Sequence, residues 1–499
     1  MIDEFQDTSK TQWHNFKPLV GNSLAQGNKN LLVGDIKQSI YRWRNSDWKI
    51  LSDEVQNDFA AFSPESRSLV TNWRSKKSII DFNNSVFCYS SQIIQEQFNS
   101  DFDDISSAEN PYKSKISEAY HDVYQHLPNE NQNTDGYVQH DFILESQFDS
   151  WRDEIKDRVV KTIENLQDKG FNLNDIAILV RRGIDGQEIA NLLIERKNQG
   201  LTQYRYDFIS GDSLYIANSS LVRFIIAVAE YILDPENDIN LSFIAYEFSQ
   251  YLNSEITENL HDILRNYKPA EKEERLQKLF PSEFIQSADQ LKQLPIYELI
   301  DRIVRIFELN KLKSELPYLQ AFLDIVLDFS KSKTADLHTF INWWNDEGQA
   351  KTLQISENQD AIRIITVHSS KGLEFKNVII PFCNWNIDHN SNKTNILWCK
   401  SHEAPFNQLD LIPVGYSQQL INTVFCNDYL KEKLHAYVDN LNLLYVALTR
   451  AENNLFLFSP LKESNKKMKH VGDLLYFTYQ NYQNFPAGKS LIEFSEGWN

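Results

Sequence analysis

The chain opens with MIDEFQDTS, in which the acidic pair Asp3-Glu4 directly follows two apolar residues. An aspartate at the end of a strand can hold a Mg²⁺ ion that bridges phosphate oxygens, and a glutamate beside it can orient and deprotonate the attacking water. The same dipeptide is also common in solvated acidic turns. Asp3-Glu4 therefore indicates a phosphate site only if other residues that can bind phosphate occur elsewhere in the sequence.

A second polar cluster lies in LLVGDIKQSIYRWRNSDWK, residues 31–49. Gln38 could hydrogen-bond a phosphate oxygen, and further along Tyr41 and Trp43 alternate with arginines, the second of which is Arg44. Aromatic faces with interleaved cations suit single-stranded nucleic acid, in which stacking contributes about 1–3 kcal/mol per base. An amphipathic surface helix, or aromatic rings that face a core, would give the same pattern.

Two segments place arginine where it could meet a nucleotide. In LVTNWRS, residues 69–75, Trp73 could stack on adenine and Arg74 could neutralise charge on a transferring phosphoryl group. In LNLLYVALTRAENNLFLF, residues 441–458, an apolar helix leads into Arg450 ahead of a strand. An arginine at a helix C-terminus also complements the helix dipole, which is the alternative explanation.

The segment ITVHSSKGLEFKNVIIP, residues 365–381, predicts a strand, a polar turn that contains Gly372, and a second strand. Such a turn places His368 and Glu374 at a strand end, where ligands bind in open α/β sheets.

These residues must be positioned by short apolar, β-rich runs that alternate with helical stretches, a pattern that predicts parallel α/β layers. The predicted strands lie at 30–35, 175–182, 362–368, 377–382 and 454–458. Between about 220 and 350 the pattern is helical, with one helix predicted to start at a serine cap at 219–220 and to stop before Pro235, and another over ADLHTFINWWNDE. Residues 100–135 are polar and predict a loop or linker.

The bulk composition fits an ordinary globular protein of 499 residues, for which roughly two to four domains are expected. The net charge of −19 lowers the expectation of nucleic-acid binding, although a basic groove can lie on an acidic molecule. The four cysteines are far apart and do not predict a zinc site or a disulfide framework. No membrane span or secretory signal is predicted, and a cytoplasmic protein is expected.

In their order and chemistry, the segments resemble the motifs of the UvrD/Rep-type superfamily 1 DNA helicases. DEFQDTS resembles motif II, VGDIKQSIYRWR motif III, NWRS motif IV, TVHSSKGLEF motif V and LLYVALTRA motif VI. Within this family, the residues of the segments YRWRNSDW and HSSKGLEF favour a resemblance to the RecB/AddA (exonuclease V-like) branch of helicase–nucleases. The helical middle of the chain corresponds to the family only by its position.

The resemblance implies an α/β fold: a RecA-like P-loop NTPase motor with a partial first domain, a complete second domain and an α-helical 2B-type insertion. The implied parts are a C-terminal remnant of the first motor domain, the second motor domain in two segments around the insertion, and a C-terminal extension. Their expected bounds are 1–68 for the remnant, 69–219 and 351–460 for the second domain, 220–350 for the insertion and 461–499 for the extension.

The resemblance also implies roles for the residues above, with ATP and Mg²⁺ as cofactors. Asp3 would hold Mg²⁺, and Glu4 would be the general base. Arg74 and Arg450 would be arginine fingers that reach the γ-phosphate.

Further roles are implied for the nucleotide and for DNA. Gln38 would sense the γ-phosphate, Glu374 would bind the ribose, and Trp73 would stack on adenine where the family usually has tyrosine. Single-stranded DNA, translocated 3′→5′, would contact Tyr41, Trp43, Arg44 and His368.

One family motif has no counterpart in the sequence: the phosphate loop G-x-x-x-x-G-K-[ST]. FPAGKS at 485–490 ends like it, but the first glycine of the motif would fall on Gln483. We therefore expect an N-terminally truncated helicase of DNA repair or recombination that is inactive alone. No nuclease constellation is found after residue 461.

Two alternatives stay open at this stage. One is a split motor whose partner chain supplies the phosphate-loop half. The other is a non-enzymatic subunit that binds single-stranded DNA. The expected partners are single-stranded or partly duplex DNA and either a chain that supplies the phosphate-loop half or an AddB/RecC-like subunit. No membrane partner is expected.

Overall fold

The computed structural model describes most of the chain, which divides into two compact units. The first unit comprises Met1–Arg181 and Thr366–Asn499, and the second comprises Arg182–Ile365. The described residues are 1–102, 110–128, 136–199, 203–210, 216–251, 276–277, 279–312, 315–332, 336–351, 360–390, 394–462, 468–481 and 491–494. Among the helices of these residues, none is long and apolar enough to cross a membrane.

A mainly parallel sheet lies at the centre of the first unit. Its strands follow the order β2-β5-β8-β1-β9, and only β9 runs antiparallel to its neighbour. β8 lies between β5 and β1, so the sheet joins the two sequence segments that form the first unit. The strands are β1 (Tyr137–Leu144), β2 (Ile176–Val180), β5 (Phe375–Ile380), β8 (Ala451–Leu461) and β9 (Leu491–Phe494).

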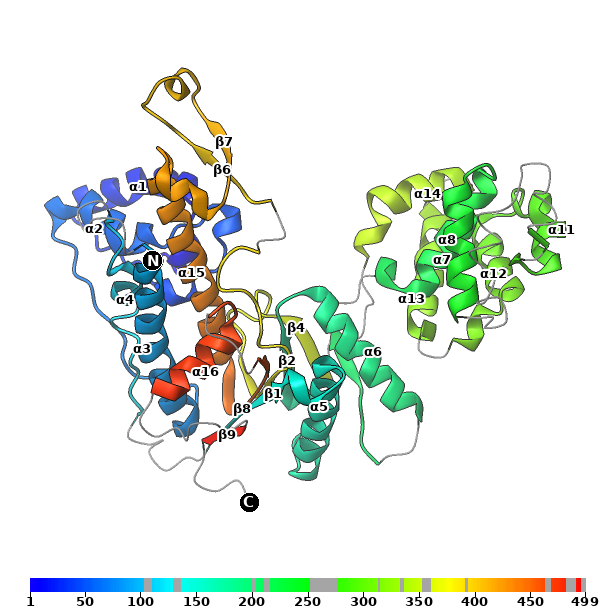
Figure 1. The fold of residues 1–499 in the computed structure, drawn as a ribbon, viewed down its shortest axis with the longest axis horizontal. Coiled ribbons are helices and arrows are strands. Elements are labelled where there is room, and N and C mark those ends of the chain that lie inside the picture. Colours follow the sequence, from blue (N-terminus) through cyan, green and yellow to red (C-terminus); the bar gives the residue numbers. More distant parts are fainter. Residues whose placement is uncertain are drawn as a thin grey trace. The chain divides into compact units, whose positions relative to one another are not determined.

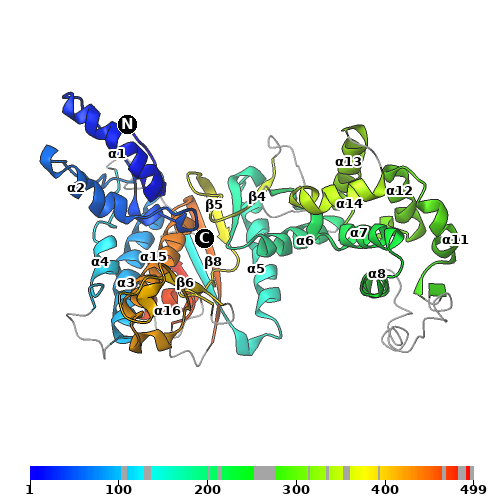
Figure 2. The same cartoon turned by 90° about the horizontal axis from the view of Figure 1, so that it is seen from above.

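Helices cover both faces of this sheet, as Figures 1 and 2 show. On one face lie α3 (Lys77–Ser100), α15 (Cys426–Leu448) and α16 (Val471–Asn481), and on the other lies α5 (Trp151–Asp168). Because both faces are covered, every residue of the IAILV segment that forms β2 is buried. The continuous apolar runs of the sequence therefore become the interior of a layered α/β structure.

The N-terminal segment packs a small core of its own. Phe5, Trp13, Val20, Ile50 and Phe59 are buried together, beneath α1 (Lys10–Ala25) and α2 (Val55–Asp58). α1 begins with a reciprocal cap, in which the Ser9 side chain accepts from the backbone N–H of Gln12 and the Gln12 side chain accepts from that of Ser9.

The strand predicted at 30–35 is wrong as an extended strand. Leu32 makes one parallel bridge with Ile2, through hydrogen bonds of 2.9 Å from Ile2 N to Leu31 O and from Val33 N to Ile2 O. The ladder is this short because Glu4 turns the chain in the left-handed conformation, with φ of 51°.

The first unit also contains a short helix and a hairpin. α4 (Lys115–Ala119) lies in the stretch predicted as a loop near 100–135. The loop prediction is therefore wrong for part of residues 110–128, where Ile116 and Tyr120 are buried. Residues 103–109 and 129–135 of the same stretch lie outside the described residues.

The hairpin pairs β6 (Ile396–Cys399) with β7 (Ile412–Gly415) in antiparallel register.

The second unit is mainly helical in its described residues. Its core gathers aromatic side chains such as Phe224, Phe248 and Phe307, whose ring centroids lie 5.0–6.4 Å apart. The strands β3 (Phe208–Ser210) and β4 (Ile362–Thr366) pair in parallel. The helices are α6 (Gly183–Gln199), α7 (Ser220–Leu233), α8 (Asp238–Tyr251), α11 (Ser282–Leu291), α12 (Ile296–Ile306), α13 (Leu316–Ser332) and α14 (Leu337–Asp346).

Several predicted elements are confirmed. The strands at 175–182, 362–368, 377–382 and 454–458 are β2, β4, β5 and β8. The predicted helix after Ser219 is α7, where the Ser219 side chain accepts from Val222 N, and ADLHTFINWWNDE contains α14, capped by Asp336. The predicted domain division and the RecA-like and 2B assignments stay predictions.

Candidate functional site

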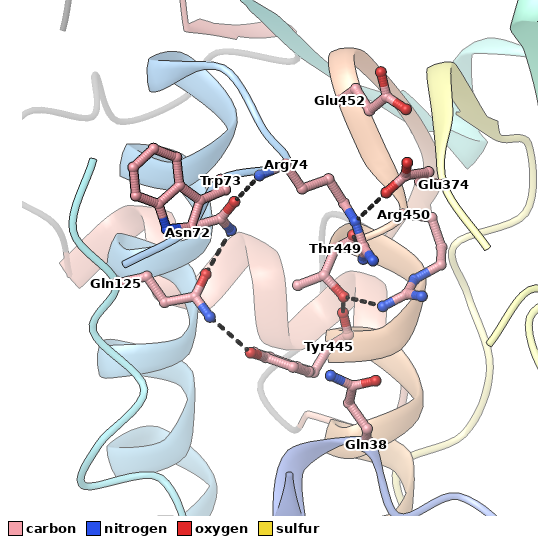
Figure 3. A pocket seen from close by; sticks show the side chains of 10 residues that line it. All are labelled: Gln38, Asn72, Trp73, Arg74, Gln125, Glu374, Tyr445, Thr449, Arg450 and Glu452. Carbon is pink, nitrogen blue, oxygen red and sulfur yellow. Dashed lines mark hydrogen bonds and ion pairs between the residues drawn. The ribbon is translucent and has the colours of Figure 1, made fainter. Parts of the chain in front are cut away.

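A pocket of about 560 Å³ in the first unit brings together five residues that the sequence singled out (Figure 3). They come from four segments that are far apart in the chain. The five are Gln38, Trp73, Arg74, Glu374 and Arg450.

Arg74 is held by contacts with two other segments. Its Nε donates to Glu374 Oε2 at 2.8 Å, its Nη1 donates to Thr449 O at 3.4 Å, and its backbone N–H donates to Asn72 Oδ1 at 2.9 Å. The neighbouring Ser75 hydroxyl donates to Ala451 O at 2.7 Å. The turn that carries Trp73 and Arg74 is thereby tied to the start of β8.

Arg450 is buried, with 1% of its surface exposed. Its guanidinium donates to Val446 O at 2.9 Å, Leu373 O at 3.0 Å and Thr449 Oγ1 at 3.0 Å. Burial, together with the charge of Arg74, lowers the pKa of Arg450 to about 10, so the group stays cationic at neutral pH. The carboxylates of Glu374 and Glu452 also line the pocket, so its two guanidinium groups suit an anion once Arg74 leaves its ion pair with Glu374.

Gln38 reaches the pocket from a 3-10 helix at Ile36–Gln38. The side chain of Asp35 caps this helix by accepting from Lys37 N at 3.0 Å, and Asp35 also accepts from Gln38 Nε2 at 3.1 Å. The amide of Gln38 is therefore oriented by a carboxylate behind it.

Sequence reasoning missed half of the lining. Figure 3 shows a chain of side chains in which Asn72 Nδ2 donates to Gln125 Oε1 at 2.7 Å and Gln125 Nε2 donates to Tyr445 OH at 3.4 Å. Gln125 lies in the stretch predicted as a loop and carries no motif signal, whereas Tyr445 is part of LLYVALTRA and was not singled out. Thr449 and Glu452 complete the lining.

Asp3 and Glu4 are not among the residues that line this pocket. Glu4 Oε2 accepts from Gln6 Nε2 at 2.7 Å and lies 3.7 Å from Lys371 Nζ, while Asp3 Oδ1 accepts from Glu4 N at 2.9 Å. In the described part of the chain, no group of three or more His, Cys, Asp or Glu side chains could hold a metal ion. Mg²⁺ usually takes only one or two protein carboxylates and leaves its other positions to phosphates and water, so a single aspartate fits it.

Lys371 joins the acidic segment to the polar turn, and sequence reasoning did not single it out. Its buried Nζ donates to both carboxylate oxygens of Asp7, at 2.6 and 2.7 Å, and to Gln38 O at 2.8 Å. The same ammonium lies 5.1 Å from the centroid of the Tyr41 ring. One cation thus touches the segment of Glu4, the backbone of Gln38 and an aromatic ring.

The four residues predicted to contact DNA lie together. The Tyr41 ring centroid is 6.2 Å from that of Trp43 and 6.1 Å from that of His368, and the Tyr41 hydroxyl donates to His368 O at 3.1 Å. The Arg44 guanidinium lies 4.5 Å from the Trp43 centroid. Trp43 is 66% exposed, so its ring is free to stack on a base. We call Tyr41, Trp43, Arg44 and His368 the aromatic platform.

His368 is uncharged at neutral pH. Burial, with the nearby charge of Arg181, lowers the pKa of His368 to about 4. Its imidazole is therefore a neutral ring and not a cation.

Comparison with known proteins gives two family matches. The UvrD-like helicase C-terminal domain matches residues 240–461, and the UvrD/REP helicase N-terminal domain matches residues 1–60.

Curated relatives match over almost the whole chain. The A subunit of the ATP-dependent helicase/nuclease from Listeria monocytogenes serotype 4b (strain F2365) is 23% identical over 507 residues, which cover 94% of this chain and 40% of the relative. The protein of the same name from Lactococcus lactis subsp. cremoris (strain SK11) and the exonuclease/helicase subunit RexA of strain MG1363 are each 25% identical, covering 94% of this chain and 41% of the relative. The chain spans about two-fifths of the length of these relatives.

Proposed function

Because the chain belongs to the UvrD/Rep-type superfamily 1 helicases, on the RecB/AddA branch, we propose that it is part of an ATP-dependent DNA helicase of DNA repair or recombination. The observation that carries this proposal is the pocket in which Gln38, Trp73, Arg74, Glu374 and Arg450 meet. Its two guanidinium groups suit a polyphosphate, and its exposed indole suits an adenine base.

We assign each residue one task in this reaction. Arg74 and Arg450 would stabilise the charge that builds on the transferring phosphoryl group, and Gln38 would contact the γ-phosphate. Trp73 would stack on the base, and Glu374 would bind the ribose once the nucleotide displaces Arg74 from its 2.8 Å ion pair.

The acidic segment would complete the site. Asp3 would hold Mg²⁺, which neutralises phosphate charge when bound, and Glu4 would accept the proton of the attacking water. The Lys371 ammonium, 3.7 Å from Glu4 Oε2, supports this role because it ties the Glu4 carboxylate to the turn that carries Lys371.

The aromatic platform would hold single-stranded DNA, with 3′→5′ movement as in the family. Lys371 supports coupling between the two sites, because it contacts both the Gln38 carbonyl and the Tyr41 ring. A nucleotide-dependent shift of the turn at Gln38 would thus reach the platform through one side chain.

We further propose that residues 1–68 belong to a first RecA-like domain, 69–219 with 351–460 to a second, 220–350 to a 2B-type insertion and 461–499 to a C-terminal extension. The sequence contains no G-x-x-x-x-G-K-[ST] motif. Hydrolysis would therefore need a phosphate-binding loop from outside these 499 residues. An AddB/RecC-like subunit is the proposed further partner.

The test measures DNA-stimulated ATP hydrolysis by the chain mixed with the phosphate-loop segment of one of the helicase/nuclease relatives. We expect hydrolysis in the mixture and at least a hundredfold loss with Glu4→Gln, which keeps the side-chain size but removes the base. Hydrolysis that Glu4→Gln leaves unchanged would contradict the assigned chemistry.

DNA binding is tested separately, by fluorescence anisotropy of a labelled single strand with the chain alone. Trp43→Ala should weaken binding about five- to a hundredfold through lost stacking. The control is Tyr246→Ala, which removes an exposed ring from α8 in the second unit and should change nothing. Equal effects of the two variants would refute the platform.

A further inference from the structure

The first unit has a second cavity, of about 830 Å³, that the proposed function does not use. Its lining comes from the start of α1, the turn after the aromatic platform, β6 and the first turns of α15. We call it the hairpin cavity, and define it by Lys10, Arg42, Asn45, Ser46, Asp47, His389, Trp398, Cys399, Asp428, Lys431, Glu432 and His435, with Thr11 and residues 394–397.

Two buried polar atoms in this lining lack a hydrogen-bond partner among the described residues: Ser46 Oγ and His435 Nδ1. Ser46 is 3% exposed and His435 is 6% exposed. Burying a polar group without a hydrogen-bond partner destabilises the fold, so its persistence needs an explanation. A ligand with hydrogen-bonding groups on its edge would satisfy both atoms.

The charges of the lining balance, which indicates a neutral ligand. Three cations, Lys10, Arg42 and Lys431, face three carboxylates, and ion pairs join Lys10 to Asp47 at 3.0 Å and Arg42 to Glu432 at 2.9 Å. Burial and the nearby charges of Lys49 and Arg42 lower the pKa of His435 to about 4, so its ring adds no charge at neutral pH.

One wall of the cavity is an exposed aromatic ring. Trp398 lies on β6 of the hairpin that stands out from the first unit in Figure 1, and 66% of its surface is exposed, the same fraction as for Trp43. An exposed indole beside buried hydrogen-bonding atoms favours a flat heteroaromatic ligand.

The cavity and the aromatic platform use neighbouring residues of the same segment. Arg42, which lines the cavity, stands between Tyr41 and Trp43 in the sequence, and Asn45 and Ser46 directly follow Arg44. The same 3-10 helix, Arg42–Arg44, therefore presents Trp43 to solvent and Arg42 to the cavity.

We propose that the hairpin cavity binds one base of single-stranded DNA, with Trp398 stacked on the base and Ser46 and His435 hydrogen-bonded to its edge. This inference rests on the proposed DNA binding at the platform and adds a second base site to it. Every base edge carries donors and acceptors, which a hydroxyl and a neutral imidazole can both meet. Lys431 supplies a cation for the neighbouring phosphate.

The first test is photo-crosslinking of the chain to a thymine-rich strand that contains 5-bromodeoxyuridine, with the crosslinked peptides mapped by mass spectrometry. We expect crosslinks in the segment of Trp398 as well as in the segment of Trp43. Crosslinks confined to residues 41–44 would overturn the cavity and leave the platform intact. An absence of DNA binding altogether would overturn both.

The second test compares variants by anisotropy of a labelled strand. Trp398→Ala should weaken binding about five- to a hundredfold, and Trp398→Phe should restore part of it. Leu409→Ala is the matched control, because Leu409 is an exposed residue of the same hairpin that does not line the cavity, and it should have no effect. Unchanged affinity in Trp398→Ala would overturn the proposal.

The third test uses Ser46→Ala, which removes a hydroxyl that is unpaired in the DNA-free chain. We expect weaker DNA binding without loss of thermal stability, whereas a purely structural hydroxyl would show the reverse. Competition by thymidine monophosphate distinguishes a free nucleotide from a base in a strand. Displacement of the strand by the monophosphate at equal concentration would overturn the assignment to DNA.

Discussion

Replacing Lys371 by methionine should destabilise the first unit, because the buried ammonium of Lys371 joins the acidic segment to the turn at Gln38. Its Nζ holds both oxygens of Asp7 and the carbonyl of Gln38, and only 5% of its side chain is exposed. Methionine keeps the length of the stem and removes the charge. Asp7 and the Gln38 carbonyl then lose their donor.

The expected magnitude follows from the burial of the two partners. Removing one member of a fully buried pair costs about 3–5 kcal/mol. Asp7 is 27% exposed, so water partly replaces the lost ammonium, and we expect a loss of about 2–3 kcal/mol. Burial raises the pKa of Asp7 even though Lys371 touches both of its oxygens, which means that desolvation offsets much of the attraction.

That offset makes the double variant the decisive measurement. Asp7→Asn alone leaves Lys371 buried with Glu4 at 3.7 Å as its remaining carboxylate, and should also destabilise. Asp7→Asn combined with Lys371→Met removes both charges, so it should cost at least about 1 kcal/mol less than the sum of the single variants.

Urea unfolding followed by tryptophan fluorescence measures these differences in the free energy of unfolding. Additive effects, or a Lys371→Met variant as stable as the parent, would refute the argument that this cation holds the segments together. Lys10→Met is the matched control, because Lys10 forms an ion pair with Asp47 at 3.0 Å but has an exposed side chain, and it should cost less than about 1 kcal/mol.

Three further results are expected. His140 is fully buried, which lowers its pKa to about 3, so the unfolded chain takes up a proton that the folded chain excludes. Stability should fall as the pH drops below about 6.5, and His140→Gln should remove up to about 1.4 kcal/mol per pH unit of that fall in unfolding curves from pH 7 to 5. Gly372 has φ of +81°, and a Cβ added there would meet nothing within 4 Å. Gly372→Ala should therefore lower the free energy of unfolding by about 1–2 kcal/mol through backbone strain alone. An unchanged midpoint of urea unfolding would contradict this. Arg450→Lys should lower the free energy of unfolding by about 2 kcal/mol, because it leaves buried carbonyl groups without donors. Arg74→Lys should lower it by only about 0.5 kcal/mol, because Arg74 is more exposed. Equal losses for the two variants would contradict the argument from burial.

The sequence predicted the strands that contain continuous apolar runs, such as IAILV in β2 and VII at the end of β5, because burial on both faces of a sheet requires such runs. It missed β1, whose YVQHDFIL segment buries a histidine and an aspartate. The buried histidine is stabilised by hydrogen bonds, since the ring nitrogens of His140 lie 2.9 Å from Tyr479 OH and 2.9 Å from Ser459 Oγ. Those partners lie more than 300 residues away, beyond any pattern in the segment itself.

The same limit applies to the candidate site. Gln38, Arg74, Glu374 and Arg450 were found because each lies in a segment with a recognisable order of residues. Gln125 was missed because its position depends on packing: its backbone exchanges hydrogen bonds of 2.8 Å with the Asn84 side chain on α3. No spacing within a single segment encodes such a contact.

The strand order of the first unit has a consequence for synthesis on the ribosome. β1 ends at Leu144, and its parallel partner β8 begins at Ala451, about 300 residues later. At about 5–20 residues per second, the edge of β1 that β8 will cover waits roughly 15–60 s for its partner. During that time the whole second unit is synthesised, so it can fold before the sheet of the first unit is closed. We therefore expect the nascent chain to depend on chaperones that shield β1 and β2 while the ribosome is still translating.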